Sequence, residues 1–197
     1  EAAVAAPGAS AAPASAADTS GLALLVTSYP QLDAGMFTED AKAEFVFVVD
    51  RSGSMAGSKM RGTIEALKLC LRAITPGSFF NIVSFGSRFT LLFAEGSREY
   101  TEASLHEALT YVDAMKADLG GTEVLEPLRT VLSAPARPTH PRQVLLLTDG
   151  EVSNTDAVIA CVRKSREESP SVRVFAFGIG KSASEPLVRG VAEAAGH

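Results

Sequence analysis

Short apolar runs alternate with segments of helical periodicity along most of the chain, and this alternation constrains the fold more than any other feature. The first run, Glu44–Asp50, is β-branched and aromatic throughout, without the polar alternation of a half-exposed strand. Such a run indicates a strand buried on both faces of a parallel sheet. Further strands are predicted over residues 79–85, 88–93, 144–148 and 172–178, and helices over residues 60–74, 101–115, 123–132, 156–168 and 184–195.

The connections between these elements predict the fold class. Only Gly86 and Ser87 separate the second and third strands, and so short a turn makes them an antiparallel pair. The other strands are joined through helices. The expected fold is therefore α/β, with a doubly wound, mostly parallel central sheet, one antiparallel edge strand and helices on both faces. Because such sheets usually continue past the last helix, we expect truncation at His197 and a poorly covered edge on the 172–178 strand.

The N-terminal part of the chain differs in composition from the rest. Residues 1–20 are mostly Ala, Ser, Pro and Gly, which is typical of a flexible linker. Residues 21–43 hold a short apolar run, interpreted as an orphan strand, and then a polar connector. The α/β domain is expected to occupy residues 44–197.

Composition excludes some classes of function. The chain has a formal net charge of -5 and no run of Lys and Arg, which argues against nucleic-acid binding. No stretch approaches the roughly 20 apolar residues of a membrane span, so no membrane insertion is expected. Cys70 and Cys161 fall in predicted helices and are expected to be buried free thiols, with a disulfide between them left open. The chain begins with Glu1 and shows no signal peptide; this start resembles a fragment boundary, which leaves secretion open.

Two of the predicted parallel strands end in aspartate, at Asp50 and Asp149. Ligands of open α/β sheets bind beyond the carboxyl ends of the strands, where the winding reverses. If the two strands are neighbours there, their carboxylates converge. Like charges about 4–5 Å apart repel by a few kcal/mol at an effective dielectric near 20, and a cation between them removes that penalty.

Hydroxyl groups accompany both carboxylates. Asp50 opens the sequence DRSGS, in which Ser52 and Ser54 alternate with other residues, so that three oxygens can turn toward one point. Such hard donors suit Mg²⁺, Mn²⁺ or Ca²⁺, whereas the lack of nearby His or Cys argues against structural zinc. Either serine could also cap the next helix. Thr122, in the sequence LGGTE, is either a further donor or a plain helix N-cap, and the sequence leaves both open.

Together these motifs resemble the metal-ion-dependent adhesion site (MIDAS) of von Willebrand factor type A domains. The resemblance covers residues 44–197. It is closest to the intracellular branch that contains von Willebrand factor A domain-containing protein 5A and the vault-associated poly(ADP-ribose) polymerase. In that branch a vault/inter-alpha-trypsin (VIT) domain comes before, and residues 22–30 would be its last strand. The matching stretches are DRSGSM (50–55), FNI (80–82), ADLGGTE (117–123), TDGEV (148–152) and FAFGIG (175–180).

The resemblance implies a role for each motif. Ser52, Ser54 and Thr122 would offer hydroxyls, and Asp50 and Asp149 would act directly or through water, around Mg²⁺ or else Mn²⁺ or Ca²⁺. An open coordination position would take a Glu or Asp carboxylate of a partner protein. The implied protein is non-enzymatic and part of a larger multidomain chain. The same branch, together with the scarcity of cysteine, favours an intracellular, cytoplasmic location.

Two alternatives stay open. One is a structural interaction domain with no functional metal. The other is a phosphohydrolase of the haloacid dehalogenase type with Asp50 as nucleophile. Such enzymes usually place a general-acid aspartate two residues later, where this chain has Ser52, which cannot do that work at neutral pH.

Overall fold

The observed elements follow the predicted alternation closely. The computed structural model describes residues 42–150, 152, 154–181 and 183–196, so the expected linker and orphan strand lie outside the described residues. The strands are β1 (Glu44–Asp50), β2 (Phe79–Phe85), β3 (Phe89–Leu91), β4 (Arg98–Glu99), β5 (Arg142–Thr148) and β6 (Val172–Gly178). The helices are the short 3-10 helix η2 (Gly53–Met55) and the α-helices α1 (Ser58–Arg72), α2 (Glu102–Asp113), α3 (Leu125–Ser133), α4 (Thr155–Glu168) and α5 (Glu185–Ala195).

The described strands form one sheet in the order β3-β2-β1-β5-β6, with β4 pairing alongside β2. β1 runs parallel to both β2 and β5, and β6 is parallel to β5, whereas β3 is antiparallel to β2. The predicted doubly wound α/β sheet with an antiparallel edge is therefore confirmed. β1 lies where the winding reverses, because the chain moves from it to β2 on one side and returns to β5 on the other. Ligand sites of such sheets lie at that point.

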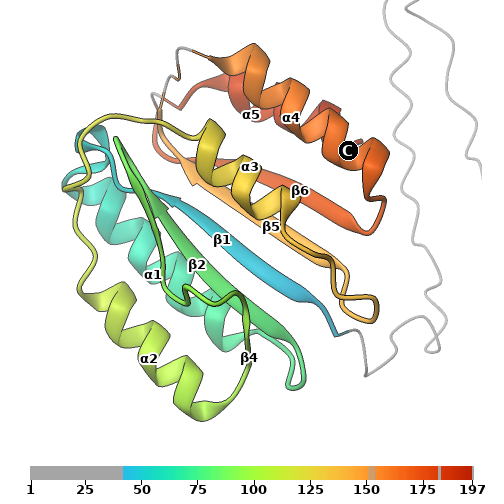
Figure 1. Cartoon of the computed structure of the whole chain (residues 1–197). Coiled ribbons are helices and arrows are strands. Elements are labelled where there is room, and N and C mark those ends of the chain that lie inside the picture. Colours follow the sequence, from blue (N-terminus) through green and yellow to red (C-terminus); the bar gives the residue numbers. More distant parts are fainter. Residues whose placement is uncertain (1–41, 151, 153, 182, 197) are drawn as a thin grey trace, which may run out of the picture. The chain divides into compact units, whose positions relative to one another are not determined.

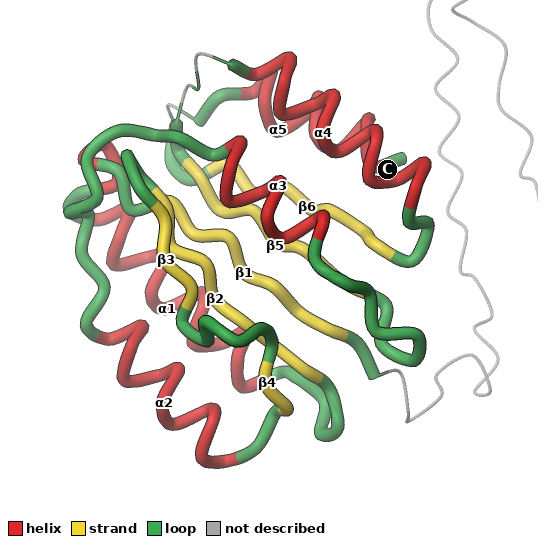
Figure 2. Tube along the Cα trace, viewed as in Figure 1, coloured by secondary structure: helices red, strands yellow, loops and turns green. Residues whose placement is uncertain are grey.

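Helices cover the two faces of the sheet in separate layers. α1 and α2 lie on one face and α3, α4 and α5 on the other (Figures 1 and 2). β1 serves both layers, since Val46 and Val48 pack with the α3–α5 layer while Phe47 and Val49 pack with the α1–α2 layer. This double burial is the reason that β1 is apolar at consecutive positions.

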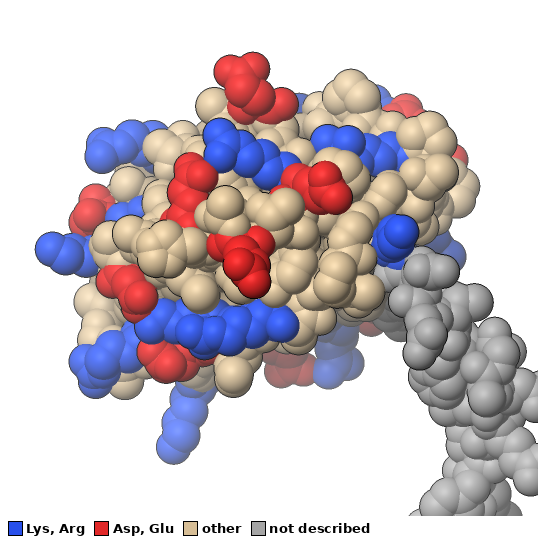
Figure 3. Space-filling view, turned by 90° about the horizontal axis from the view of Figure 1, so that it is seen from below, with Lys and Arg blue, Asp and Glu red and all other residues tan. Residues whose placement is uncertain are grey.

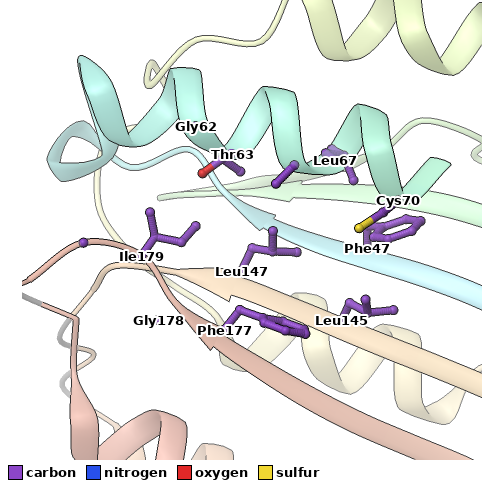
Figure 4. Close-up of a pocket in the computed structure, with 12 residues that line it drawn as sticks. Phe47, Gly62, Thr63, Leu67, Cys70, Leu145, Leu147, Phe177, Gly178 and Ile179 are labelled. Atoms are coloured by element: carbon purple, nitrogen blue, oxygen red, sulfur yellow. The ribbon is translucent and has the colours of Figure 1, made fainter. Parts of the chain in front are cut away.

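β6 is an edge strand, as expected, and pairs with no strand of the described part other than β5. Beside it, on the α1 face, runs an apolar groove of about 400 Å³. Leu145, Leu147 and Phe177 point into this groove from the sheet, and α1 forms its other wall (Figure 4). Phe177 is 48% exposed, so the sheet is less completely covered on this face than on the other.

The cysteines correct one expectation. Both are free thiols, but Cys70 is exposed and Cys161 is only half-buried. The prediction of two buried thiols was wrong because Cys70 lines the open groove between α1 and the sheet, where it stays exposed (Figure 4).

Charged side chains of both signs are interspersed on the face shown in Figure 3. That face therefore carries no basic stripe of the kind that tracks phosphates. Among the described residues, no helix has the length and apolar character needed to cross a membrane.

Candidate metal site at the carboxyl ends of the strands

Three loops meet where β1 and β5 end, at the left of Figure 1. The parallel register pairs Val49 with Leu147, which brings the ends of the two strands side by side. Thr148 Oγ1 donates a hydrogen bond of 2.6 Å to Asp50 Oδ2, and the Ser52 amide donates one of 2.8 Å to Asp50 Oδ1. Both oxygens of the first aspartate are thus held in place by its neighbours.

The serines of the first loop connect the two aspartates. Ser52 Oγ lies 3.0 Å from Ser54 Oγ, and Ser54 Oγ donates a hydrogen bond of 2.8 Å to Asp149 Oδ1. Neither serine makes a side-chain capping hydrogen bond: Ser52 is the N-cap residue of η2 but has no such bond, and the N-cap of α1 is Gly57. The expectation that one of these side chains also caps a helix was therefore wrong, because the hydroxyls turn toward each other and toward Asp149 instead of toward the helix amides.

Thr122 belongs to the third loop, which packs directly on the first. The Gly53 amide donates a hydrogen bond of 2.8 Å to the Gly120 carbonyl. The Thr122 side chain lies over the second aspartate loop, since a Cβ on Gly150 would be 2.8 Å from Thr122 Cγ2 and 3.4 Å from Thr122 Oγ1. The N-cap of α3 is Val124, so the interpretation of Thr122 as a plain N-cap was wrong.

The third loop is anchored by residues that the sequence interpretation did not single out. Arg51 Nε donates to the Lys116 carbonyl at 2.8 Å, and the Arg51 guanidinium pairs with Asp118 at 2.5 Å. From the other side, Ser87 Oγ accepts a hydrogen bond of 2.8 Å from the Gly121 amide. These contacts join segments far apart in the chain. The position of Arg51 inside the DRSGS motif could have marked it as part of the site, whereas nothing in the sequence marked Ser87 as a contact of the third loop.

A lysine also reaches the site. Lys59 Nζ, from the first turn of α1, lies 2.5 Å from Asp149 Oδ2. Its side chain is 26% exposed, whereas that of Asp149 is 1% exposed. Sequence reasoning missed it because Lys59 stands outside the DRSGS motif and looks like an ordinary solvated charge on a helix.

The site has a buried floor and an open rim. Asp50, Ser52 and Asp149 are buried, whereas Thr122 is half-buried and Ser54 is exposed. Burial raises the pKa of the Asp50 carboxyl and outweighs the hydrogen bonds from Thr148 and Ser52, which lower it; the charge of Asp149 raises it further. Ionised Asp50 is therefore costly in the protein alone, and a cation in contact with it would offset this cost.

This donor set fits a hard divalent cation. It combines two carboxylates with hydroxyl groups, which are ligands that Mg²⁺, Mn²⁺ and Ca²⁺ accept. No group of three or more His, Cys, Asp and Glu side chains in the described part of the chain is arranged to hold a metal ion. The site therefore differs from structural zinc centres, which depend on His and Cys ligands.

Comparisons with known proteins agree with this geometry. A family model described as "von Willebrand factor type A domain" matches residues 43–196. A von Willebrand factor A domain-containing protein of Dictyostelium discoideum is 44% identical over 172 residues, covering 87% of this chain and 18% of that protein. Human von Willebrand factor A domain-containing protein 5A is 39% identical over 181 residues, covering 87% of this chain and 22% of that protein. The chain thus spans about a fifth of these relatives' length.

Solved structures share the fold at low sequence identity. Manganese-loaded Plasmodium vivax TRAP protein has a TM-score of 0.60 and 20% identity, with 78% of this chain and 63% of that chain covered. Proximal thread matrix protein 1 from the mussel byssus, in a form with a zinc-occupied MIDAS motif, has a TM-score of 0.64 and 20% identity. The match to this byssus protein covers 77% of this chain and 41% of that chain.

Proposed function

Because the chain belongs to the von Willebrand factor type A domain family, we propose that it binds one divalent cation and uses it to capture an acidic group of a partner protein. The proposed ligands are Asp50, Ser52, Ser54, Thr122 and Asp149, directly or through water. Mg²⁺ is the expected cation, with Mn²⁺ or Ca²⁺ as substitutes. A bound cation would supply a positive charge and an open coordination position to a carboxylate.

The observation that carries this proposal is the hydrogen-bonded chain from Ser52 through Ser54 to Asp149, with Asp50 beside it. These groups come from loops about a hundred residues apart, yet they share one point at the end of the sheet. Buried polar groups are expensive unless they are paired. A set of oxygens turned toward one another, and open to solvent at Ser54, is what a cation with an exchangeable position requires.

The two structural neighbours support the choice of ligand class, because one is manganese-loaded and the other has a zinc-occupied MIDAS motif. The burial of Asp50 disfavours the phosphohydrolase alternative, because a substrate must reach a nucleophilic carboxylate and Asp50 is fully buried, whereas an ion can be held by it through water. We therefore assign a non-enzymatic role.

The setting of the domain forms part of the proposal. Since the chain spans about a fifth of its curated relatives, we place it within a larger multidomain protein. Its two free thiols suit a reducing compartment, and an intracellular location accompanies the assignment. The acidic group would be a Glu or Asp side chain, which a metal-centred, charge-assisted contact can hold over a small area.

The test uses Mn²⁺ as the probe ion and acetate as the probe for the open position. Binding of Mn²⁺ is followed by electron paramagnetic resonance, and acetate is detected by its displacement of Mn²⁺-bound water in proton relaxation. We expect Ser52→Ala to weaken Mn²⁺ binding at least about tenfold, a loss of about 1.4 kcal/mol. Ser58→Ala, an exposed serine just past the loop, is the matched control and should bind as the parent does. Equal Mn²⁺ binding by both variants would overturn the assignment.

A further inference from the structure

Lys59 holds the second aspartate of the site through a direct ion pair. Its Nζ lies 2.5 Å from Asp149 Oδ2, while Asp149 Oδ1 accepts the hydrogen bond from Ser54. Both oxygens of Asp149 therefore have protein partners, one neutral and one cationic. The ammonium group is therefore as close to Asp149 as Ser54, another proposed cation ligand, is.

The fold fixes Lys59 in this position. The residue lies in the first turn of α1, which begins at Ser58 directly after the loop that carries the serines. Its aliphatic stem runs along the loop after β6, because a Cβ on Gly180 would lie 3.1 Å from Lys59 Cε. A glycine with a φ of +83° occupies that position, so a side chain there would be strained in addition to crowding the lysine stem.

The ion pair changes the charge of the site. Among the described residues at the site, the Asp50 and Asp149 carboxylates contribute a charge of minus two when both are ionised, and Lys59 reduces this count to minus one. The nearby Arg51–Asp118 pair adds no net charge. With a divalent cation bound, the same count gives plus one, whereas without the lysine it would be zero. A positive charge at this distance disfavours a cation and favours an anion, and partial burial limits the screening of both effects.

We propose that Lys59 sets the balance between cation and anion binding at this site: it weakens the intrinsic affinity for the divalent cation and strengthens the hold on the acidic group. This inference rests on the proposed function and adds a determinant to it. The domain would exchange its metal readily when no acidic group is present and retain both when one is captured. Metal and acidic partner would bind with positive coupling because the partner's carboxylate coordinates the metal, so each would raise the affinity for the other.

The experiment compares substitutions that keep or remove the charge. Lys59→Met retains the stem that packs along Gly180, Lys59→Gln repeats the loss of charge with a polar side chain, and Lys59→Arg keeps the charge. Lys68→Met is the matched control: this lysine of α1 pairs with Glu65 and Asp113 and lies nine residues along the helix, about 14 Å away. Affinity for Mn²⁺ is measured by calorimetry without acetate, and acetate affinity is then measured on the Mn²⁺-saturated proteins.

The expected result has opposite signs in the two titrations. Lys59→Met and Lys59→Gln should bind Mn²⁺ about tenfold more tightly, and their Mn²⁺-loaded forms should bind acetate several-fold more weakly. Lys59→Arg and Lys68→Met should match the parent in both. If the neutral variants bind Mn²⁺ equally or more weakly, Lys59 merely positions Asp149 and the inference is wrong, although the proposed function stands. If the parent itself binds no Mn²⁺, both fall together.

Discussion

Replacement of Asp50 by asparagine separates two effects of this carboxylate: the loss of stability caused by burying its charge, and the gain in stability when it binds a cation. Asp50 is buried at the end of β1, and burial raises the pKa of its carboxyl above the ordinary value of 3.8. In the metal-free folded protein the ionised form of Asp50 is therefore disfavoured relative to the unfolded chain. Asparagine has nearly the same shape without that charge. We expect metal-free Asp50→Asn to unfold at a temperature no lower than the parent at pH 7.

The sign of the pH dependence follows from the same shift. Because the folded protein binds the Asp50 proton more tightly than the unfolded chain, the free energy of unfolding of the metal-free parent includes a contribution that falls as pH rises from 3.8 through the raised folded pKa. Above that pKa the penalty is constant. Asp50→Asn should lack this fall, and the difference in unfolding free energy between the two proteins should stop changing with pH well below 3.8.

With a bound cation, the parent should become the more stable of the two proteins. At a free Mn²⁺ concentration about one hundred times Kd, a folded-state ligand stabilises the parent by about 2.7 kcal/mol. For a domain of this size that corresponds to a rise in Tm of about 5–11 °C. Asp50→Asn should show almost none of this rise, because the ion loses a charged ligand. Thermal unfolding followed by circular dichroism gives the Tm of the parent and of Asp50→Asn, each in chelator and in Mn²⁺.

Asp113→Asn makes the same chemical change at an exposed aspartate that pairs with Lys68, and it should keep the full Mn²⁺ shift. A metal-free Asp50→Asn protein that melts several degrees below the parent would show that the hydrogen bonds of Asp50 outweigh its desolvation. An undiminished Mn²⁺ shift in that variant would exclude Asp50 as a ligand.

Other expected outcomes concern the frame that holds the site. Arg142→Met should destabilise the domain by about 3–5 kcal/mol in urea unfolding, because buried Glu44, whose carboxylate lies 2.8 Å from the guanidinium, loses its partner. If the losses of stability in Arg142→Met and Glu44→Gln simply added in the double variant, this reasoning would be wrong. Thr101→Ala should cost about 1 kcal/mol, since it removes the capping box with Ser104, and an unchanged urea midpoint would refute it. Phe177→Ala should cost only about 1–2 kcal/mol, less than a buried phenylalanine, because about half of its surface is exposed; a loss of about 3 kcal/mol or more would contradict this exposure.

Much of the fold could be predicted from sequence because its signals are local. The apolar run of β1 indicated a doubly buried strand, and the Gly86-Ser87 turn required β3 to be antiparallel to β2. Helix ends were predicted less well: α1 begins at Ser58, two residues before the expected start at Met60, because a helix end depends on capping and packing as well as on apolar periodicity. The burial of Cys70 was predicted wrongly for a related reason, since periodicity does not show which flank of a helix its neighbours leave open.

The sequence alone determined which oxygen-bearing side chains stand at loop positions, since DRSGS, LGGTE and TDG are contiguous motifs. The tertiary structure alone decided what those side chains face. Ser54 bonds to Asp149, and Lys59 pairs with the same aspartate. Thr122 lies over Gly150 instead of capping α3. The physical reason is that these contacts join residues separated by up to 95 positions. No local propensity encodes such contacts, and they arise only when the parallel register of β1 and β5 brings the loops together.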